Sequence, residues 1–179
     1  MPSFSISGAV PKVVAKSACR IDEETFQLLY ERTARPLRGY LSRLLGDPAA
    51  VDDLLQESYL RLLKAKLPEG VSDEHLKNYL FRIATNLSRD YQGRRAETAL
   101  PEDAATTAAA PADGDVARLF AGLKPSQREL LWLAYVEKFS HVEIGQMLSL
   151  KPQSIRPLLS RARHALAEVL RQGGFGEAK

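Results

Sequence analysis

The sequence predicts an all-α protein made of two small helical domains that are joined by a flexible acidic linker. Every strong apolar periodicity in the 179 residues repeats at three- and four-residue steps, and no stretch alternates at period two for long. The hydrophobic content of 45% is enough for real cores, and the low aromatic share of 7% suits helical packing. We expect a flexible N-terminal tail, a first domain, the linker, a second domain and a C-terminal tail, at residues 1–20, 21–95, 96–115, 116–172 and 173–179.

The first domain should begin with two long helices. Asp22 can cap the first helix, and Pro36 falls within it and should kink or split it. Asp47 followed by Pro48 is a start signal for the second, because it combines an N-cap residue with proline at the first helical position. The apolar spacing predicts that this second helix ends at about Ala65.

A third helix should complete this three- to four-helix bundle after a loop at residues 66–71. Ser72 or Asp73 can cap it. Apolar residues of all three helices recur at helical spacing and predict one shared core. They are Phe26, Leu29, Tyr30, Leu37, Leu41, Leu44, Val51, Leu54, Leu55, Leu62, Leu63, Leu76, Tyr79, Leu80, Ile83, Leu87 and Tyr91.

The segment at 96–115 separates the two halves. Ala, Thr, Pro and Gly dominate it, and every charged residue in its stretch is acidic. It is too poor in large apolar residues to fold alone. Two interpretations stay open: a spacer, or an acidic segment that imitates a nucleic-acid backbone.

The second domain should contain four short helices. The first starts near Val116, and a capping box at residues 126–129 opens the next. Ser140 and Glu143 form another capping box, which opens a helix–turn–helix whose turn lies at 149–151. The apolar residues predicted to face inward here are Ile144, Met147, Leu148, Ile155, Leu159, Ala162, Leu166 and Val169.

The last helix carries a basic face opposite its apolar one. Arg156, Ser160 and Arg163 share that face, with Arg161 and His164 beside it. This pattern is typical of a helix that packs on its domain with one side and meets phosphates and base edges in a major groove with the other. An ordinary amphipathic surface helix would show a similar face.

Other classes of function find little support. Cys19 is the single cysteine, and His75, His141 and His164 are scattered, so we expect no metal site and no cofactor. No apolar run reaches ~18 residues, which predicts no membrane insertion. The basic N-terminus lacks the apolar block of a secretory signal, and the lone cysteine fits the reducing cytoplasm. No catalytic triad or glycine-rich phosphate loop is present, so we do not expect an enzyme.

Three segments in the right order resemble one family. Residues 51–62 (VDDLLQESYLRL) resemble its AEDLVQEVFLRLW helix, and residues 80–91 (LFRIATNLSRDY) resemble its LFRIARNLALDHLRR helix. The second half resembles its LPxxQRE…EGLSYEEIAxxLGIS…TVKSRLSRAR pattern. The family is the bacterial extracytoplasmic-function (ECF) sigma factors, and the resemblance covers roughly residues 22–172. It implies core RNA polymerase and promoter DNA as partners, and an anti-sigma factor as a further candidate.

The resemblance also implies roles for individual residues. The residues that match the polymerase-binding helix are Asp52, Asp53, Leu55, Gln56, Glu57 and Tyr59. Those that match the part holding the −10 promoter element are Lys66, Tyr79, Arg82, Asn86, Arg89, Asp90, Arg94 and Arg95. Those on or beside the −35 recognition helix are Gln153, Ser154, Arg156, Ser160, Arg161, Arg163 and His164.

The sequence departs from the family pattern at several positions. Tyr79 and Thr85 stand where tryptophan and arginine are usual, and Ser149 and Lys151 stand where the pattern has glycine and an N-cap serine or threonine. Most consequential are Pro157 and Leu158, in place of serine and a basic residue.

A proline inside a helix deletes a backbone hydrogen bond. We therefore expect the recognition helix to start about a turn late, with Ser154 as N-cap, or to be kinked at its N-terminus. A sigma-like decoy or adaptor without productive promoter contact is the alternative function. A stand-alone helix–turn–helix repressor would leave residues 22–95 unexplained.

Overall fold

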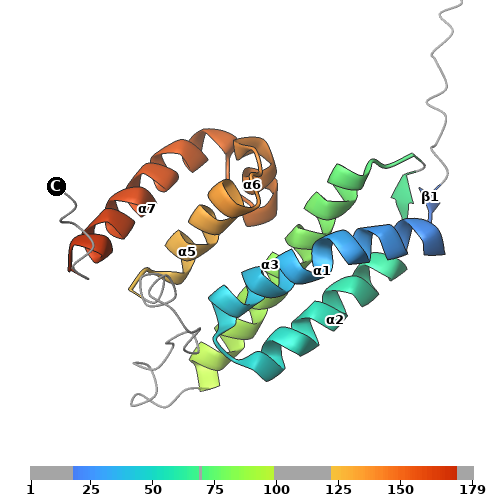
Figure 1. Cartoon of the computed structure of the whole chain (residues 1–179), viewed down its shortest axis with the longest axis horizontal. Coiled ribbons are helices and arrows are strands. Elements are labelled where there is room, and N and C mark those ends of the chain that lie inside the picture. The colour runs from blue at the N-terminus through green and yellow to red at the C-terminus, as the bar shows by residue number, and fades with distance from the viewer. Residues whose placement is uncertain (1–17, 69, 99–121, 173–179) are drawn as a thin grey trace, which may run out of the picture.

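The structure, a computed structural model, describes residues 18–68, 70–98 and 122–172 (Figure 1). In chain order and with the labels of Figure 1, the elements are β1 (Ala18–Cys19), α1 (Glu23–Leu45), α2 (Pro48–Lys64), β2 (Leu67–Pro68), α3 (Asp73–Thr98), α5 (Pro125–Leu131), the π-helical turn η2 (Trp132–Val136), α6 (His141–Leu148) and α7 (Pro152–Gln172). The all-α fold class is confirmed. Periodicity did not predict the π-helical turn η2 or the antiparallel pairing of the two short strands β1 and β2.

The first domain consists of α1, α2 and α3, which pack against one another (Figure 1). The predicted caps are confirmed: the Asp22 carboxylate accepts a hydrogen bond from the Thr25 N–H at 2.9 Å, and Asp47 accepts one from the Ala49 N–H at 3.0 Å. Gly46 ends α1 in the left-handed conformation, with φ of 68°. This residue turns the chain within two positions, so α2 runs back along α1.

The second domain consists of α5, η2, α6 and α7, and α6 and α7 form the helix–turn–helix. The predicted capping box is confirmed, since the Glu143 carboxylate accepts from the Ser140 N–H at 2.7 Å and the Ser140 hydroxyl accepts from the Glu143 N–H at 3.3 Å. Ser149 then ends α6 at φ of 55°. The expected helix near Val116 and most of the acidic segment lie outside the described residues.

Three expectations about helix starts and breaks were wrong in whole or in part. The expectation that Pro36 splits α1 was wrong, since the helix is continuous from Glu23 to Leu45 and buried side chains on both sides of the proline hold it to the core. The alternative, a kink at Pro36, stays a prediction. The capping box at 126–129 does not form. Instead α5 begins at Pro125, and the Gln127 side chain accepts from the Lys124 N–H at 3.0 Å. Glu129 is buried rather than capping.

The expectation of a late start for α7 with Ser154 as N-cap was also wrong, since α7 begins at Pro152. The alternative, a kink near its N-terminus, stays a prediction. Proline is well suited to the first helical position, where its missing N–H costs nothing. Ile155, fully buried, holds this first turn to the core. The turn also lies tightly on α6: a Cβ atom placed on Gly145 would come within 2.8 Å of the Leu150 carbonyl oxygen. Tertiary packing therefore outweighs the cost of Pro157 inside the helix.

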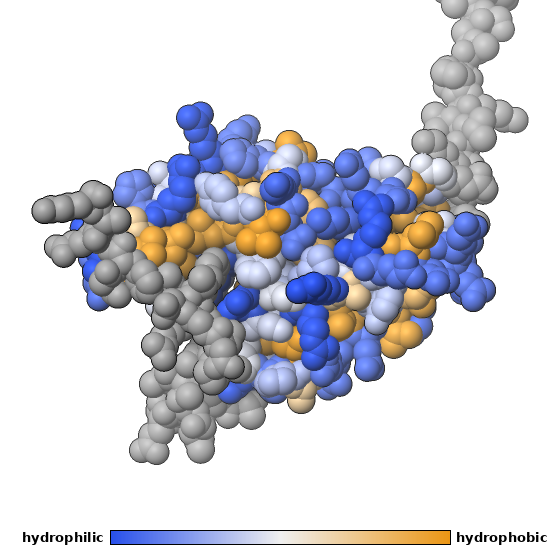
Figure 2. Space-filling model, viewed as in Figure 1, coloured by the Kyte–Doolittle hydropathy of each residue, from blue (hydrophilic) through white to orange (hydrophobic). Residues whose placement is uncertain are grey.

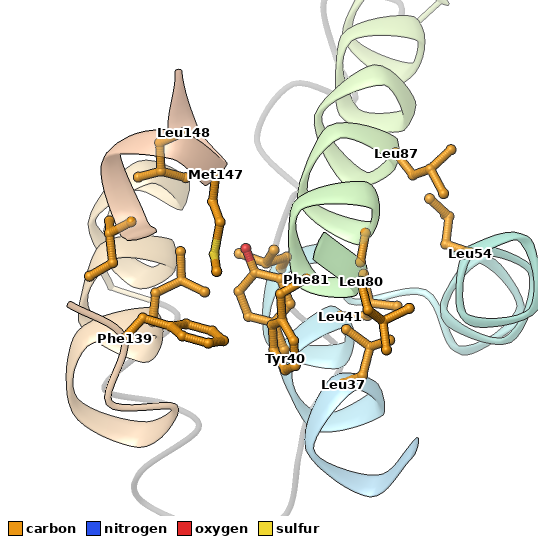
Figure 3. Close-up of a cluster of buried hydrophobic side chains, with 14 of the residues drawn as sticks. Leu37, Tyr40, Leu41, Leu54, Leu80, Phe81, Leu87, Phe139, Met147 and Leu148 are labelled. Carbon is orange, nitrogen blue, oxygen red and sulfur yellow. The ribbon is translucent and has the colours of Figure 1, made fainter. Parts of the chain in front are cut away.

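The two domains share one hydrophobic core (Figure 3). Phe139 and Met147 of the second domain point toward Tyr40 and Phe81 of the first in that view. The rings of Phe81 and Phe139 meet edge to face, with centroids 5.2 Å apart. Apolar burial of this kind is the main stabilising term in folding, so the domains form one packed body in this structure.

Side chains on the surface alternate in character. On the face seen in Figure 2, apolar patches are separated by polar and charged groups. None of the described helices combines the length and the apolar character that crossing a membrane requires.

Candidate nucleic-acid interface

The residues expected to hold the −10 strand lie mainly along α3 and are largely exposed. Lys66, Tyr79, Arg82, Asn86 and Asp90 present their side chains to solvent. Arg94 and Arg95 continue the exposed series toward the end of α3. The fully buried Thr85 lies on another face, where its hydroxyl is 2.8 Å from that of Tyr40. Thr85 therefore serves the core and cannot meet a DNA strand in this arrangement.

Arg89 differs from the other residues expected to bind the −10 strand because it is bound to the second domain. Its guanidinium donates to the Glu129 carboxylate at 2.7 Å and to the Leu148 carbonyl at 3.2 Å. The Tyr40 hydroxyl donates to the same carboxylate at 3.4 Å. Burial raises the pKa of Glu129, although the bonds from Arg89 and Tyr40 act to lower it. The first domain thus supplies a cation and a hydroxyl to a carboxylate buried in the second.

A second buried carboxylate repeats this arrangement. Lys77 of α3 lies 2.9 Å from the Glu137 carboxylate, whose side chain is only 5% exposed. The Lys77 ammonium also lies over the rings of Phe81 and Phe139, 5.5 and 5.0 Å from their centroids. Cations are attracted to aromatic faces at such distances. The Lys77 ammonium therefore contacts both the Glu137 carboxylate and the aromatic rings of the shared core.

A groove runs between the two domains next to these contacts. It has a volume of about 750 Å³. From the first domain it is lined by the loop before α3 and by His75, Tyr79 and Arg82, and from the second by Val142 and Gln146 of α6. It brings two residues expected at the −10 strand, Tyr79 and Arg82, opposite the first helix of the helix–turn–helix. A DNA strand on α3 would have to share this space with α6.

The residues expected to read the −35 element lie on α7. Ile155, Leu159 and Ala162 bury one side of this helix, and α7 packs against α5 and α6. The opposite side is exposed at Gln153, Arg156, Arg161, Arg163 and His164, whereas Ser154 and Ser160 are half-buried. The geometry is that of a helix with one packed and one basic, solvent-facing side, which a major groove can accept.

The acidic helix α2 offers a smaller charged surface than the sequence suggested. Asp52 is paired with Arg38, and Glu57 with Arg61 at 2.7 Å. Asp53 and Gln56 are exposed, and the half-buried Leu55 packs against the core. We find no ion pair for Asp53 within the described residues.

Tyr59 was expected beside this acidic face but is only 5% exposed. Its hydroxyl is 2.7 Å from that of Thr33, and its ring lies against those of Phe26 and Tyr30. The Tyr59 side chain therefore packs inside the first domain and not on the exposed face of α2. Leu60, which sequence reasoning did not single out, is 47% exposed and lies one turn beyond Gln56. A helical-wheel count from Gln56 would have found it.

Sequence reasoning also missed Arg128, which is 4% exposed. Its guanidinium donates to the Arg43 carbonyl of α1 at 3.3 Å, while its Nε has no hydrogen-bond partner among the described residues. Burial lowers the pKa of Arg128. Charged groups are rarely buried. The buried Arg128 adds a further polar contact between the domains through its hydrogen bond to the Arg43 carbonyl.

These features define a class: a two-domain helical protein with a helix–turn–helix, a second exposed basic helix and an acidic helix. Two family descriptions match the chain, Sigma-70 region 2 over residues 29–98 and Sigma-70, region 4 over residues 113–166. RNA polymerase sigma factor CarQ of Myxococcus xanthus is 30% identical over 158 residues, which cover 83% of this chain and 90% of CarQ. ECF RNA polymerase sigma factor SigW of Bacillus subtilis is 24% identical, covering 72% of this chain and 80% of SigW.

Solved structures agree on the fold. CnrH in complex with the cytosolic domain of CnrY superposes with a TM-score of 0.62 at 23% identity, covering 84% of this chain and 90% of that one. Sigma factor RpoE in complex with the anti-sigma factor NepR, from Bartonella quintana, gives 0.65 at 20% identity, covering 83% and 98%. The chain belongs to the ECF sigma factor family. It is therefore a non-enzymatic factor that binds core RNA polymerase and directs promoter-specific initiation.

Proposed function

We propose that the packed arrangement is a resting form, which opens when the protein binds core polymerase. In the open form α2 contacts polymerase, α3 and the loop before it hold the −10 strand, and α7 reads the −35 element. The boundaries 21–95 and 116–172 describe the two units that separate. The protein works in the cytoplasm, where RNA polymerase is.

The single observation that carries this proposal is the pairing of Arg89 with Glu129 at 2.7 Å. Arg89 occupies a family position for contact with the −10 strand, and the phosphates of that strand would compete with Glu129 for the same guanidinium. A carboxylate and a phosphate both accept charge-assisted hydrogen bonds from arginine. In the packed form the second domain therefore blocks one of the groups that DNA needs.

Promoter dimensions give independent support. The numbering of the −10 and −35 elements places them ~25 base pairs apart, which is roughly 85 Å at 3.4 Å per base pair. The longest helix here, α3, has 26 residues and spans ~39 Å at 1.5 Å per residue. Domains that touch through Phe81 and Phe139 cannot reach both elements at once. Reading the whole promoter requires the shared core to separate.

Distance measurement between the domains tests the proposal. Arg35 of α1 and Ala167 of α7 are exposed and outside the assigned sites, so Arg35→Cys and Ala167→Cys can carry a fluorophore pair in a Cys19→Ser background. We expect high transfer in the free protein and a marked loss of transfer on adding core polymerase. Equal transfer in the free and polymerase-bound states would overturn the opening. Failure to bind core would overturn the assignment of α2.

An anti-sigma factor is a further proposed partner, by analogy with the complex of RpoE and NepR. Exposed apolar side chains support it: Val142 is 53% and Tyr79 37% exposed, and both line the groove between the domains. A partner helix could bury them. Val142→Asp should abolish capture of such a partner while leaving core binding intact. Purification with the wild-type chain and with the variant as bait, side by side, tests this.

A further inference from the structure

The loop before α3 has empty space on both of its sides. On one side lies the groove of about 750 Å³ that contains Tyr79 and Arg82. On the other lies a cavity of about 320 Å³ between the loop and the segment from Arg20 to Thr25. Leu67, Pro68 and Val71 line both spaces. The loop therefore separates the groove from the cavity. Its position determines the shape of the groove next to α3.

Apolar packing holds part of this loop. Leu67 and Val71 pack partly buried against the core, together with Ile21 from the N-terminal segment. Gly70 takes a φ of 73°, and an added Cβ there would meet nothing within 4 Å. The loop thus turns beside open space at Gly70, and the backbone pairing of β2 with β1 adds to the hold that Leu67 and Val71 have on the core.

That pairing depends on one pair of residues. Ala18 lies opposite Pro68, and Cys19 lies opposite Leu67. Proline has no N–H, so the pair of Ala18 and Pro68 cannot exchange two hydrogen bonds. In an antiparallel ladder such exchange occurs at alternate pairs, which leaves the pair of Cys19 and Leu67 to supply it. Removing the N–H of residue 19 would therefore remove one of the two hydrogen bonds that this pair can exchange.

We infer that β1 is a specificity element: the backbone of residues 18 and 19 positions the loop that shapes the −10 binding surface. The inference rests on the proposed function, because it assumes that Tyr79, Arg82 and the loop meet the −10 strand. Residues 18 and 19 act through the loop and touch no DNA themselves. Their loss should relax base selection at the −10 element without weakening the contacts of α2 or α7.

The test compares Cys19→Pro, which deletes the N–H, with Cys19→Ser, which retains it. Each variant and the wild type are reconstituted with core polymerase and mixed with a pool of fork-junction DNA whose −10 bases are randomised. We expect Cys19→Ser to match the wild type. For Cys19→Pro we expect enrichment of the best −10 sequences to fall about fivefold, with core affinity and binding to −35 duplex unchanged.

A second pair of variants guards against a local effect of proline. Deleting residues 1–19 should reproduce the loss, whereas deleting residues 1–17 keeps β1 and should not. Hydrogen exchange in the free proteins should show faster exchange at Leu67 in Cys19→Pro and in the longer deletion, but not in Cys19→Ser or in the shorter deletion. Full base selection by Cys19→Pro and by the longer deletion would overturn the inference. A wild-type holoenzyme without any −10 preference would instead overturn the proposed role of α3.

Discussion

Arg89 and Glu129 form an ion pair of 2.7 Å across the two domains, with the Glu129 side chain only 6% exposed and that of Arg89 39% exposed. The asymmetry matters because only the carboxylate loses most of its water on packing. Removing water from a charged group costs free energy that its partner repays in part. Arg89 keeps access to solvent and can leave for another anion, whereas Glu129 would be left buried if the domains stayed together.

Glu129→Gln should change how stability depends on pH. Burial raises the pKa of Glu129 above its ordinary value of 4.5 in the packed form. The packed form therefore holds the proton more tightly than the unfolded chain does. The stabilising contribution of this group is fully present below pH 4.5 and is lost as the pH rises through the raised pKa. Glutamine does not titrate, so the variant should be at least as stable as the wild type at neutral pH.

Thermal unfolding between pH 4.5 and 7.5 measures this difference. The wild type should lose melting temperature relative to Glu129→Gln as the pH rises. Glu168→Gln is the matched control, since Glu168 pairs with Arg171 on the exposed surface of α7 and should show no such trend. A variant that is clearly less stable than the wild type at pH 7 would mean that the ion pair outweighs the cost of burial.

The turn between α6 and α7 offers a pair of opposite substitutions. Ser149 has a φ of 55°, a conformation that costs a non-glycine residue about 1–2 kcal/mol. Ser149→Gly should stabilise the protein by about 0.5–1 kcal/mol. Gly145→Ala should destabilise it by about 1–3 kcal/mol, because the new Cβ would lie 2.8 Å from the Leu150 carbonyl oxygen.

Urea denaturation of both variants gives these free energies. Lys138→Gly provides a comparison for Ser149→Gly, since Lys138 also has a positive φ, of 60°, but lies before α6. It should stabilise by a similar amount. If Ser149→Gly were destabilising, the hydroxyl or side chain of Ser149 would have to contribute more than its backbone strain costs.

Local signals predicted most of the fold, and long-range contacts explain what they missed. The caps at Asp22, Asp47 and Ser140 were read correctly because each bond spans three residues or fewer. The role of Glu129 could not be read, because its partner Arg89 lies 40 residues away. Glu129 follows Ser126 by three positions, which is the spacing of a capping box. The local pattern therefore predicted a capping role that Glu129 does not have.

The candidate sites show the same division. Helical spacing placed Arg156 and Arg163 on an exposed face, which the structure agrees with. Spacing could not tell that Tyr59 turns inward, because its position on α2 borders both the acidic face and the core, and the aromatic cluster with Phe26 and Tyr30 decides the matter. Whether a side chain between the polar and apolar faces of a helix is buried depends on the neighbouring helix.

The polymerase-binding role of α2 predicts unequal effects for adjacent aspartates. Asp53 is exposed without an ion pair in the described part of the chain, whereas Asp52 is paired with Arg38. An exposed charge pair is worth about 0.2–1 kcal/mol. Asp53→Asn should therefore weaken binding to core polymerase by about two- to fivefold, and Asp52→Asn by less, because a partner must first displace Arg38.

Titration of labelled protein with core polymerase at low and high salt measures both affinities. The difference between the variants should shrink at high salt, since screening weakens exposed charges. Glu74→Gln is a control, because Glu74 is an exposed acid on α3, outside the proposed contact. Equal losses for all three variants would indicate a general charge effect and not a contact by α2.

Pro157 should be the costliest residue of the recognition helix. It is the sixth residue of α7, so it leaves the Gln153 carbonyl without the N–H that would bind it. Pro157→Ala restores that bond and should stabilise the protein by about 1–3 kcal/mol in urea denaturation. Pro152→Ala is the control, since a proline at the first helical position removes no helical bond and its loss should change stability by less than about 0.5 kcal/mol. Equal effects of both substitutions would mean that the chain bends at Pro157 and recovers the cost of the missing bond through contacts elsewhere.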